Sequence, residues 1–324
     1  MKNFKIYMLI TAFCAATITA VFANDLSISA DRQSFKMEEN KAKFDGNVKV
    51  QYEELTVTGP RAEVNIDPKS KKLTDAVFFD QPYVIEVKKG KTNEIKSNIL
   101  KMSLLNKTVR AEGNTQTTVR EDGNLKPTVI ITADTQEYDT NTKTLTAEGS
   151  VIIYYKDIET FSDKAVANLT KDGDLKKITL TGHGKLKQED SIITGNQFVY
   201  DAITEEAWAT GNTHSDVLMD DSRIKVWADR QQYNKKTNTL MANGAVHVIY
   251  KDYDAKGPKA TVYPDPKTGK FNEVVFLGRS TIVESMRSIT ADRINMFLNP
   301  KNFYAEGNVQ TVIRNVQSQK GDVL

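Results

Sequence analysis

Cysteine is almost missing from this chain, which has one, Cys14, among 324 residues. A single cysteine cannot form a disulfide within the chain, so the fold must be held by its own core. Histidine is nearly as scarce, and each one stands without a cysteine, a second histidine or a carboxylate at ligand spacing: His183, His214 and His247. The sequence therefore predicts no metal site. It also lacks nucleophile-elbow, P-loop and dinucleotide-binding motifs, so we expect no cofactor and no enzymatic activity.

An excess of charge of one sign is also lacking. The chain has 44 basic and 42 acidic residues, and without Lys2 and Lys5 the two counts are equal at 42. A nucleic-acid-binding protein normally has a basic face, which a neutral chain does not favour. We therefore expect no nucleic-acid partner.

Long hydrophobic runs are absent except near the start. Lys2 and Lys5 precede an apolar run from Ile6 to Val21, and the small residues for cleavage follow at Val21 and Ala23. This pattern predicts a signal peptide over residues 1–23, cleaved after Ala23, and an exported mature chain. An uncleaved membrane anchor is the alternative.

What the sequence does contain is a strict repeat. An Asp or Asn is followed fifteen residues later by a Gly, six times along the chain. The pairs are Asp31/Gly46, Asn98/Gly113, Asp134/Gly149, Asn196/Gly211, Asp229/Gly244 and Asp292/Gly307. A period held this strictly indicates one structural unit built repeatedly.

Each repeat, called a cassette below, has the pattern of a strand, a tight turn and a strand. Apolar residues alternate with polar ones before the Gly, as at Leu145 and Ala147, and Asn141 lies in a turn cluster midway. This period of two is typical of a strand buried on one face, and the helical spacings of three and four are absent. The Gly permits a second turn or a bulge. We therefore predict an all-β fold of about 28 to 30 strands of five or six residues.

The cassettes group into three longer repeats. A second signature recurs after alternate glycines, at Gly59–Ala62, Ser162–Ala165 and Gly257–Ala260. We therefore divide the mature chain into repeats over 24–127, 128–222 and 223–324, stacked as one continuous elongated β-structure. The first is the longest because it contains a Lys- and Asn-rich insertion at 87–95.

The recurring Asp residues allow two interpretations. Carboxylates at equivalent positions in every cassette suggest a catalytic or calcium-binding row. However, Asn98 and Asn196 replace Asp without loss of pattern, and a short polar side chain that bonds its own backbone suits a strand entry or bulge. We favour the structural role.

A large apolar residue follows each opening Asp or Asn by four positions. The members of this column are Phe35, Met102, Tyr138, Tyr200, Tyr233 and Met296. They form either a closed core or the wall of an apolar trough along a half-open β-sandwich. Such a trough suits acyl chains. The spacing alone does not separate the two.

Three segments resemble the repeats of the LptA/OstA family of lipopolysaccharide-transport proteins. They are ISADRQSFKMEENKAKFDGNVKV at 28–50, ITADTQEYDTNTKTLTAEGSVII at 131–153 and ITADRINMFLNPKNFYAEGNVQT at 289–311. The resemblance implies a twisted β-jellyroll of two facing antiparallel sheets, open along a seam, that holds lipid A acyl chains in the periplasm. It also implies an inner-membrane LptC-like partner and an outer-membrane LptD-like partner, joined through terminal edge strands, and head-to-tail self-association.

The resemblance also implies lipid-contacting positions in this sequence. Those carried over from the family's motif are Leu26, Ile28, Ile85, Met102 and Leu104. Internal repetition extends the set to Ile131, Tyr138, Val226, Tyr233, Ile289 and Met296, and the apolar column adds Phe35 and Tyr200.

Three alternatives stay open at this point. One is an exported structural or adhesive repeat protein with a closed core. The second is an LptC-like, inner-membrane-anchored component of the same pathway, if the signal is not cleaved. The third, a β-solenoid polysaccharide-active enzyme, would need acidic or basic residues clustered on one rung, whereas here the acidic residues recur at equivalent strand entries.

Overall fold

The computed structural model describes residues 27–314, apart from 37, 53–54, 71, 89, 172–173, 220–221 and 299–300. Regular structure in these ranges consists of 22 strands, β1 to β22. The prediction of an all-β fold is confirmed. None of the described residues form a helix with the length and hydropathy needed to cross a membrane. The expected signal peptide lies outside the described residues.

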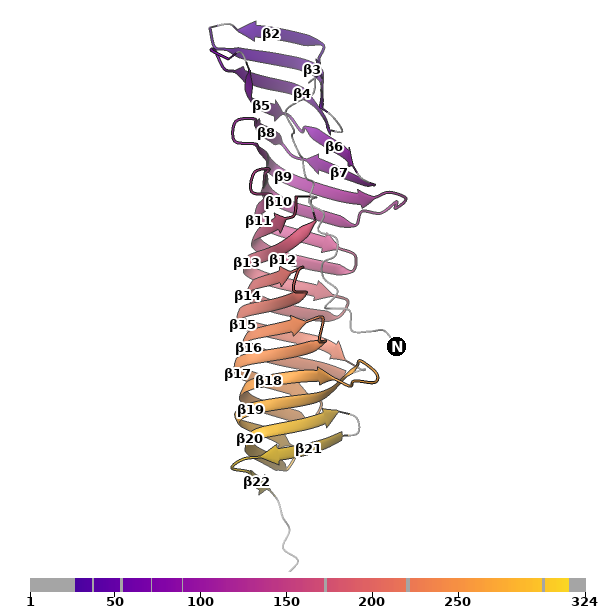
Figure 1. The fold of residues 1–324 in the computed structure, drawn as a ribbon, viewed down its shortest axis with the longest axis vertical. Helices are drawn as coiled ribbons and strands as arrows, with labels where there is room; N and C mark the ends of the chain where they lie inside the picture. The colour runs from indigo at the N-terminus through magenta and orange to yellow at the C-terminus, as the bar shows by residue number, and fades with distance from the viewer. Residues whose placement is uncertain are drawn as a thin grey trace, which may run out of the picture. The chain divides into compact units, whose positions relative to one another are not determined.

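Residues 27–189, together with 199–204, belong to one compact unit, here called the N-terminal unit. Its strands pair antiparallel with near neighbours along the chain: β3 carries both β1 and β2, β4 carries β5 and β6, and β9 carries β7 and β8 (Figure 1). From β9 to β13 each strand pairs with the next. The bounds are β1 Ser27–Ser29, β2 Arg32–Lys36, β3 Lys41–Tyr52, β4 Leu55–Ile66, β5 Leu73–Phe79, β6 Tyr83–Lys88, β7 Lys91–Lys96, β8 Ile99–Ser103, β9 Thr108–Glu121, β10 Val129–Asp139, β11 Thr144–Tyr155, β12 Ile158–Leu169 and β13 Leu175–Gln188.

Residues 190–198 and 205–314 belong to a second compact unit, the C-terminal unit. β14 (Ser191–Asp201) contributes residues to both units. From β15 to β21 each strand pairs antiparallel with the next, and β22 pairs with β20. The bounds are β15 Glu206–Met219, β16 Ser222–Asn234, β17 Thr239–Tyr250, β18 Tyr253–Pro264, β19 Phe271–Glu284, β20 Arg287–Leu298, β21 Lys301–Glu306 and β22 Gln310–Ile313. The division of the sequence into three repeats remains a prediction.

The Asp–Gly pairs form bulges at which the strands bend. Thr132 pairs with Ile152 and Thr135 with Glu148, so β11 has one residue more than β10 between these pairings. Gly149 (φ +80°) and Ser150 (φ +47°), in the left-handed region, form this bulge. A Cβ on Gly149 would collide with the carboxylate of Asp134, which covers it. The sequence left open a turn or a bulge at the glycine, and the structure shows the bulge.

The contacts at these bends support a structural role for the recurring Asp residues. The Asp31 amide donates to the Gly46 carbonyl at 2.8 Å, and the Asp31 carboxylate accepts from Asn47 Nδ2 at 2.8 Å. At the second pair, the Asn98 amide donates to the Gly113 carbonyl at 2.9 Å, so Asn can stand in for Asp. These contacts account for the pattern without a ligand.

The second signature of the sequence belongs to the same kind of bend. Asp163 covers Gly182 (φ +79°), and Pro258 covers Gly278 (φ +84°), in the way that Asp134 covers Gly149. The two signatures look different in the sequence because their spacings differ. The structure shows that both bend a strand.

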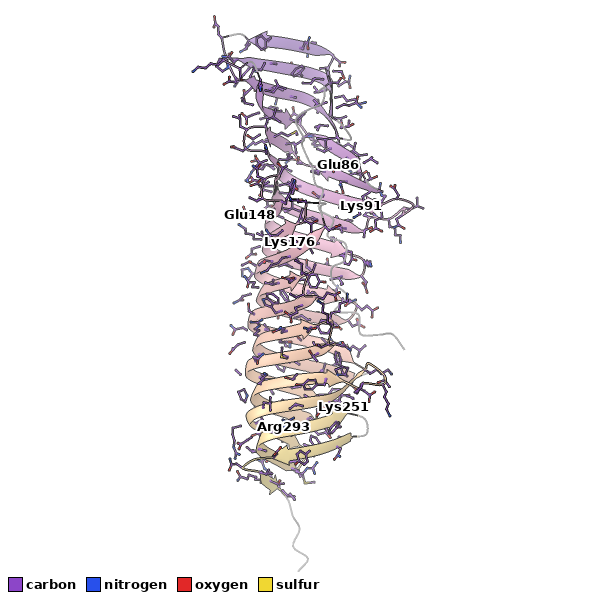
Figure 2. All side chains as sticks on the ribbon, viewed as in Figure 1. Glu86, Lys91, Glu148, Lys176, Lys251 and Arg293 are labelled. Atoms are coloured by element: carbon purple, nitrogen blue, oxygen red, sulfur yellow. The ribbon has the colours of Figure 1, made fainter. Side chains whose placement is uncertain are left out.

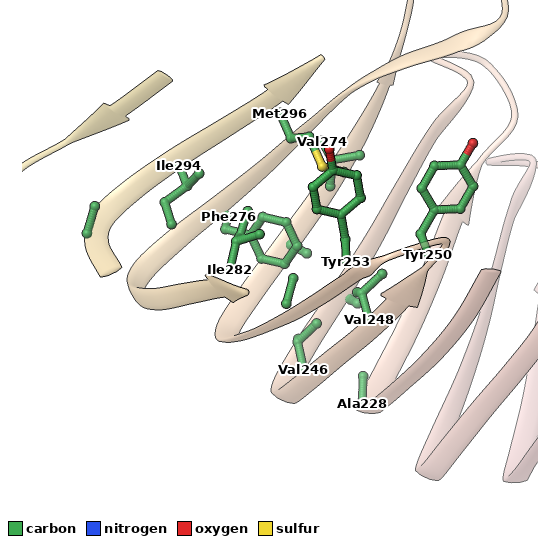
Figure 3. Packing of buried hydrophobic residues seen from close by; sticks show 14 residues of the cluster. Ala228, Val246, Val248, Tyr250, Tyr253, Val274, Phe276, Ile282, Ile294 and Met296 are labelled. Atoms are coloured by element: carbon green, nitrogen blue, oxygen red, sulfur yellow. The ribbon is translucent and has the colours of Figure 1, made fainter. Parts of the chain in front are cut away.

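The bend gives each strand two arms whose apolar faces share one core. In the C-terminal unit the buried cluster includes Ala242, which precedes Gly244. It also includes Val246, which follows Gly244 (Figure 3). In the N-terminal unit it includes Phe44 and Val48 on either side of Gly46. Because the strands continue through the bulge, many are 11 to 14 residues long. The expectation of 28 to 30 short strands was therefore wrong.

Candidate functional site

The inward face of each unit carries most of the predicted lipid-contacting residues. Four are buried, with exposed fractions of 2% for Ile131, 3% for Tyr138, 6% for Tyr200 and 4% for Met296. Four more are half-buried and pack against the apolar clusters: Ile28, Met102, Val226 and Ile289. The structure therefore brings these residues to the interior of their units. Whether they contact lipid stays a prediction.

The remaining predicted positions differ. Phe35 is 51% exposed because β2 is an end strand, covered on one side only by β3. Leu104 is half-buried in the turn after β8, and Tyr233 is half-buried with its hydroxyl donating to Asn238 Oδ1 at 3.1 Å. Leu26 lies outside the described residues.

Ile85 is on the wrong face for the predicted role. In β6 the inward side chains are Val84 and Glu86, with exposed fractions of 2% and 5%. They pair with Val57 and Leu55 of β4, which are also buried, whereas Ile85 pairs with Thr56. Because successive side chains of a strand alternate between faces, Ile85 points away from the interior. The register of this strand was not encoded locally, and the expectation was off by one residue.

A continuous apolar row crosses the N-terminal unit on this inward face. Neighbouring members pair with one another from strand to strand. In order the row is Phe35, Ala42, Val64, Ala76, Met102, Val109, Tyr138, Leu145, Ala167 and Ile178. An equivalent row in the C-terminal unit is Ala207, Tyr233, Leu240, Val262, Val274, Met296 and Phe303. These rows are the structural form of the apolar column seen in the sequence.

The interior also contains a hydrogen-bonded polar group that occurs once in each unit. In the N-terminal unit, Gln136 Nε2 donates to Thr115 Oγ1 at 2.9 Å, and Thr117 Oγ1 donates to Gln136 Oε1 at 2.7 Å. The side chains of all three residues are buried. They connect β9 with the part of β10 beyond its bend. In the sequence, Gln136 two residues after Asp134 does not by itself indicate this hydrogen-bonded group.

The C-terminal unit repeats the same arrangement. Gln231 Nε2 donates to Thr213 Oγ1 at 2.9 Å, and Ser215 Oγ donates to Gln231 Oε1 at 2.6 Å. In both units the Gln side-chain Nε2 also donates to a backbone carbonyl of its own strand at 3.2 Å. The recurrence indicates a fixed brace across the bend. The pattern Thr-x-Thr/Ser after Gly-Asn was the available sequence signal.

A second polar group, for which the sequence gave no signal, lies in the N-terminal unit. Asn93 Nδ2 donates to the Glu86 carboxylate at 3.0 Å, and both side chains are buried (Figure 2 labels Glu86 on β6). Burial, and then the nearby Glu86 and Asp139 carboxylates, raise the pKa of Tyr138 to about 12. Asn93 belongs to the segment 87–95 interpreted as an insertion, but from Lys91 onward these residues lie in β7, with Asn93 and Ile95 directed inward.

A small cavity lies beside Tyr138. Its volume is about 20 Å³, and it is lined mainly by apolar side chains: Ile95, Val109, Ala111, Thr117, Gln136, Tyr138 and Leu145. This space is about that of one water molecule. The interior of the N-terminal unit is therefore closely packed near Tyr138.

The histidines do not form a metal site in the described ranges. His214 and His247 stack on opposite sides of Trp227, with ring-centroid distances of 4.7 and 5.1 Å. His183 Nδ1 lies 2.8 Å from Asp163 at a bend. Among the described residues no group of three His, Cys, Asp or Glu side chains could hold a metal ion.

Each unit has a strand edge that pairs with no described residue. β1 and β2 pair only with β3, and β21 and β22 pair only with β20. Such edges present backbone N–H and C=O groups that can pair with a further strand.

Comparison with known families now assigns the first part of the chain. Residues 27–125 match the family described as LptA/(LptD N-terminal domain) LPS transport protein. This segment is similar to LptA and to the N-terminal domain of LptD. It begins with β1 and ends after β9, and the bends at Gly46 and Gly113 lie within it. The bends at Gly149, Gly211, Gly244 and Gly307 continue the same construction beyond the LptA-like segment.

Matches to individual proteins are weaker than the match to the family. No curated protein matches the chain. Among solved structures, one match is the crystal structure of LptH, the LptA homologous periplasmic component of the conserved lipopolysaccharide transport device from Pseudomonas aeruginosa. The identity is 14%, the TM-score is 0.33, and the match covers 39% of this chain and 83% of that one.

Proposed function

We propose that this LptA-like protein binds lipopolysaccharide in the periplasm and carries it between the inner and outer membranes, with the acyl chains in its apolar interior. The observation that supports this best is the inward apolar row in each unit. Met102 and Val226, on this inward face, are only half-buried although they pack against the cores. Inward apolar side chains that stay accessible provide a surface for a further apolar group.

The free energy of such binding is sufficient without any specific polar contact. Each CH₂ group removed from water contributes about 0.8 kcal/mol, so an acyl chain of about twelve carbons contributes roughly 10 kcal/mol before the costs of association. To admit the chain, the two arms of each strand must separate, which exposes part of the present core. The net free energy of binding is then the gain from burying the acyl chain minus the cost of exposing that part of the core.

The end strands support the proposed partners. Gln33 occupies the cassette position of Gln136, but β2 has no preceding described strand to supply hydroxyl groups. On β22, Thr311 follows Gly307 by four residues, as Thr117 follows Gly113. A β21–β22 edge placed against β1–β2 would thus repeat the pairing of β9 with β10. This geometry suits head-to-tail association of copies, or pairing with LptC-like and LptD-like strands.

Site-specific photocrosslinking in intact cells tests the binding. A photoreactive residue is placed at Ile28, Tyr138 or Met296, and at the exposed Lys49 and the outward Tyr154 as controls. We expect lipopolysaccharide adducts at the three interior positions and not at the controls. Tyr154 is a matched control because it adjoins the buried Tyr155 on β11. A folded, exported protein without interior adducts would exclude the lipid-binding function.

A cysteine pair tests the end-to-end pairing. Phe35 and Phe303 occupy the cassette positions at which Tyr138 pairs with Val109. In a Phe35→Cys, Phe303→Cys variant, oxidation should give disulfide-linked ladders, because the predicted mature chain has no other cysteine. Phe35→Cys with Tyr304→Cys, which shifts the second position to the other face, is the control. Ladders of equal yield would argue against this register.

One observation favours the alternative of a closed, purely structural core. The largest side chains at the centres of the clusters, Phe78, Leu100, Phe276 and Ile294, are at most 1% exposed. A core packed this tightly needs no ligand. The same crosslinking experiment separates the two functions, since a closed core gives no adduct at Tyr138 or Met296. The LptC-like alternative depends on residues 1–23, and the N-terminal sequence of the exported protein decides it.

A further inference from the structure

The N-terminal unit has polar atoms in its interior whose hydrogen-bonding capacity is not used within the described part of the chain. Asn93 Oδ1 and Tyr138 Oη are both fully buried and have no hydrogen-bond partner there. The two side chains are 7% and 3% exposed. A buried polar group without a partner is unfavourable, so its presence calls for an explanation.

These atoms lie in one region of the interior. Asn93 is bonded to Glu86, and the Glu86 carboxylate is close enough to Tyr138 to raise the pKa of its hydroxyl. Ile95, two residues beyond Asn93 on the same strand face, lines the cavity beside Tyr138. The region therefore combines an amide acceptor, a phenol donor and a carboxylate with apolar walls.

The chemistry of these groups selects the ligand. Asn93 Oδ1 and the Glu86 carboxylate accept hydrogen bonds, while the Tyr138 hydroxyl can donate one. A phosphate or carboxylate would be repelled by Glu86. A hydroxyl group both donates and accepts, and it is neutral. The apolar side chains Val109 and Leu145 around it require that the hydroxyl be carried on an otherwise apolar chain.

We infer that Asn93 and Tyr138, with Glu86, form a polar subsite that binds the hydroxyl group of a hydroxylated acyl chain inside the N-terminal unit. This inference rests on the proposed lipid binding and names the kind of chain that the N-terminal unit prefers. The ligand hydroxyl donates to Asn93 Oδ1 and accepts from Tyr138 Oη. The rest of the chain lies against the apolar row.

The C-terminal unit supplies a matched contrast. Tyr233 holds the same cassette position as Tyr138, four residues after the opening Asp. Its hydroxyl is already bonded to Asn238. Among the described residues of the C-terminal unit, the buried polar side chains are Ser191, Thr213, Ser215, Thr261 and Ser280, so no Asn or Glu is buried there. We therefore expect no preference for a hydroxylated chain there.

The test is a binding measurement with two fluorescent ligands that differ only in one hydroxyl. They are the dansyl-ethylenediamine amides of tetradecanoic acid and of 3-hydroxytetradecanoic acid, whose linkage avoids a charged carboxylate. The full mature protein is titrated with each. We expect the hydroxylated ligand to bind about three- to tenfold more tightly, as one or two buried neutral hydrogen bonds imply.

Two variants assign the preference. Tyr138→Phe removes only the hydroxyl and should abolish most of the difference in affinity between the two ligands. Tyr233→Phe, the matched control, should leave the difference intact. Equal affinities in the unmodified protein, or a preference that survives Tyr138→Phe, would overturn the subsite. If neither ligand bound, the proposed lipid binding would fail together with it.

Discussion

The two units share one construction but differ in what their interiors contain. Both bend their strands at Asp–Gly bulges, and both brace a bend with a Gln and two hydroxyls. In the N-terminal unit, however, several buried polar atoms lack a described partner, among them those of Asn93, Tyr138 and Tyr155. In the C-terminal unit, within the described residues, only His214 Nε2 does. The repeat therefore fixes the frame and leaves the inward side chains free to differ in chemistry.

A substitution that disturbs a bend should have the largest effect on stability. Gly149→Ala forces a Cβ into the Asp134 carboxylate at a left-handed φ, and we expect a loss of about 3 kcal/mol in the free energy of unfolding. Gly123→Ala is the control, because Gly123 has a similar φ (+81°) but no atom near the added Cβ. It should cost about 1 kcal/mol. Urea denaturation of both variants measures the difference, and equal losses would show that the covering Asp is unimportant.

The braces should give a smaller effect that differs between the units. Gln136→Leu leaves the buried Thr117 hydroxyl without its acceptor, and we expect a loss of about 2 kcal/mol. Gln231→Leu should cost about half as much, since Gln231 is only half-buried. Gln33→Leu, at the exposed equivalent position, should change stability by less than about 0.5 kcal/mol. If all three losses were the same, burial of the brace would not be the cause.

A hydroxyl deletion should separate the two interiors by the sign of its effect. Tyr138→Phe removes a buried hydroxyl without a described partner, so the ligand-free protein should be unchanged or stabilised by up to about 1 kcal/mol. Tyr233→Phe removes a hydroxyl bonded to Asn238 and should destabilise by about 0.5–1 kcal/mol. Thermal unfolding followed by circular dichroism reports both. Destabilisation by Tyr138→Phe would reveal a partner for its hydroxyl.

Alkaline titration should give the smallest difference. The folded pKa of Tyr138 is about 12, above the ordinary value near 10, because burial and the Glu86 carboxylate disfavour the phenolate. Because the unfolded chain releases this proton more readily than the folded one, the contribution of this group to stability is constant below about pH 10 and falls as the pH rises towards 12. Stability curves of the unmodified protein and of Tyr138→Phe should separate in that window. Parallel curves would mean that the phenol titrates normally.

Much of the frame was predictable from sequence because its determinants are local. Each opening Asp or Asn contacts the Gly fifteen residues later, so this spacing is enough to locate six bends along the chain. The bends at Gly182 and Gly278 have other spacings. Tyr138 and Met296, two members of the apolar column recognised in the sequence, are buried in the structure. The number of strands was overestimated because a bulge and a turn leave the same residue signature.

The rest depended on long-range pairing that no local pattern encodes. The face of Ile85 is set by the register of β6 against β4, about thirty residues earlier in the chain. Asn93 was assigned to an insertion because its neighbours are Lys, Thr and Glu, yet its strand pairs with both β6 and β9. The predicted lipid contacts stay predictions, and the polar interior around Glu86 could not be seen in the sequence without these pairings.

The pairing of each strand with near neighbours in sequence also bears on how the chain acquires its structure. Contacts between segments close in sequence form with little loop-closure entropy, which favours fast folding for an all-β protein. Each bend can form as soon as its two strands exist, so the chain can gain order from its beginning as it is made. At every stage the last strand formed is an open edge, vulnerable to the wrong partner until the next strand covers it. Crowding with other copies is then most hazardous while the chain is still folding, because an open edge can pair with a strand of another copy.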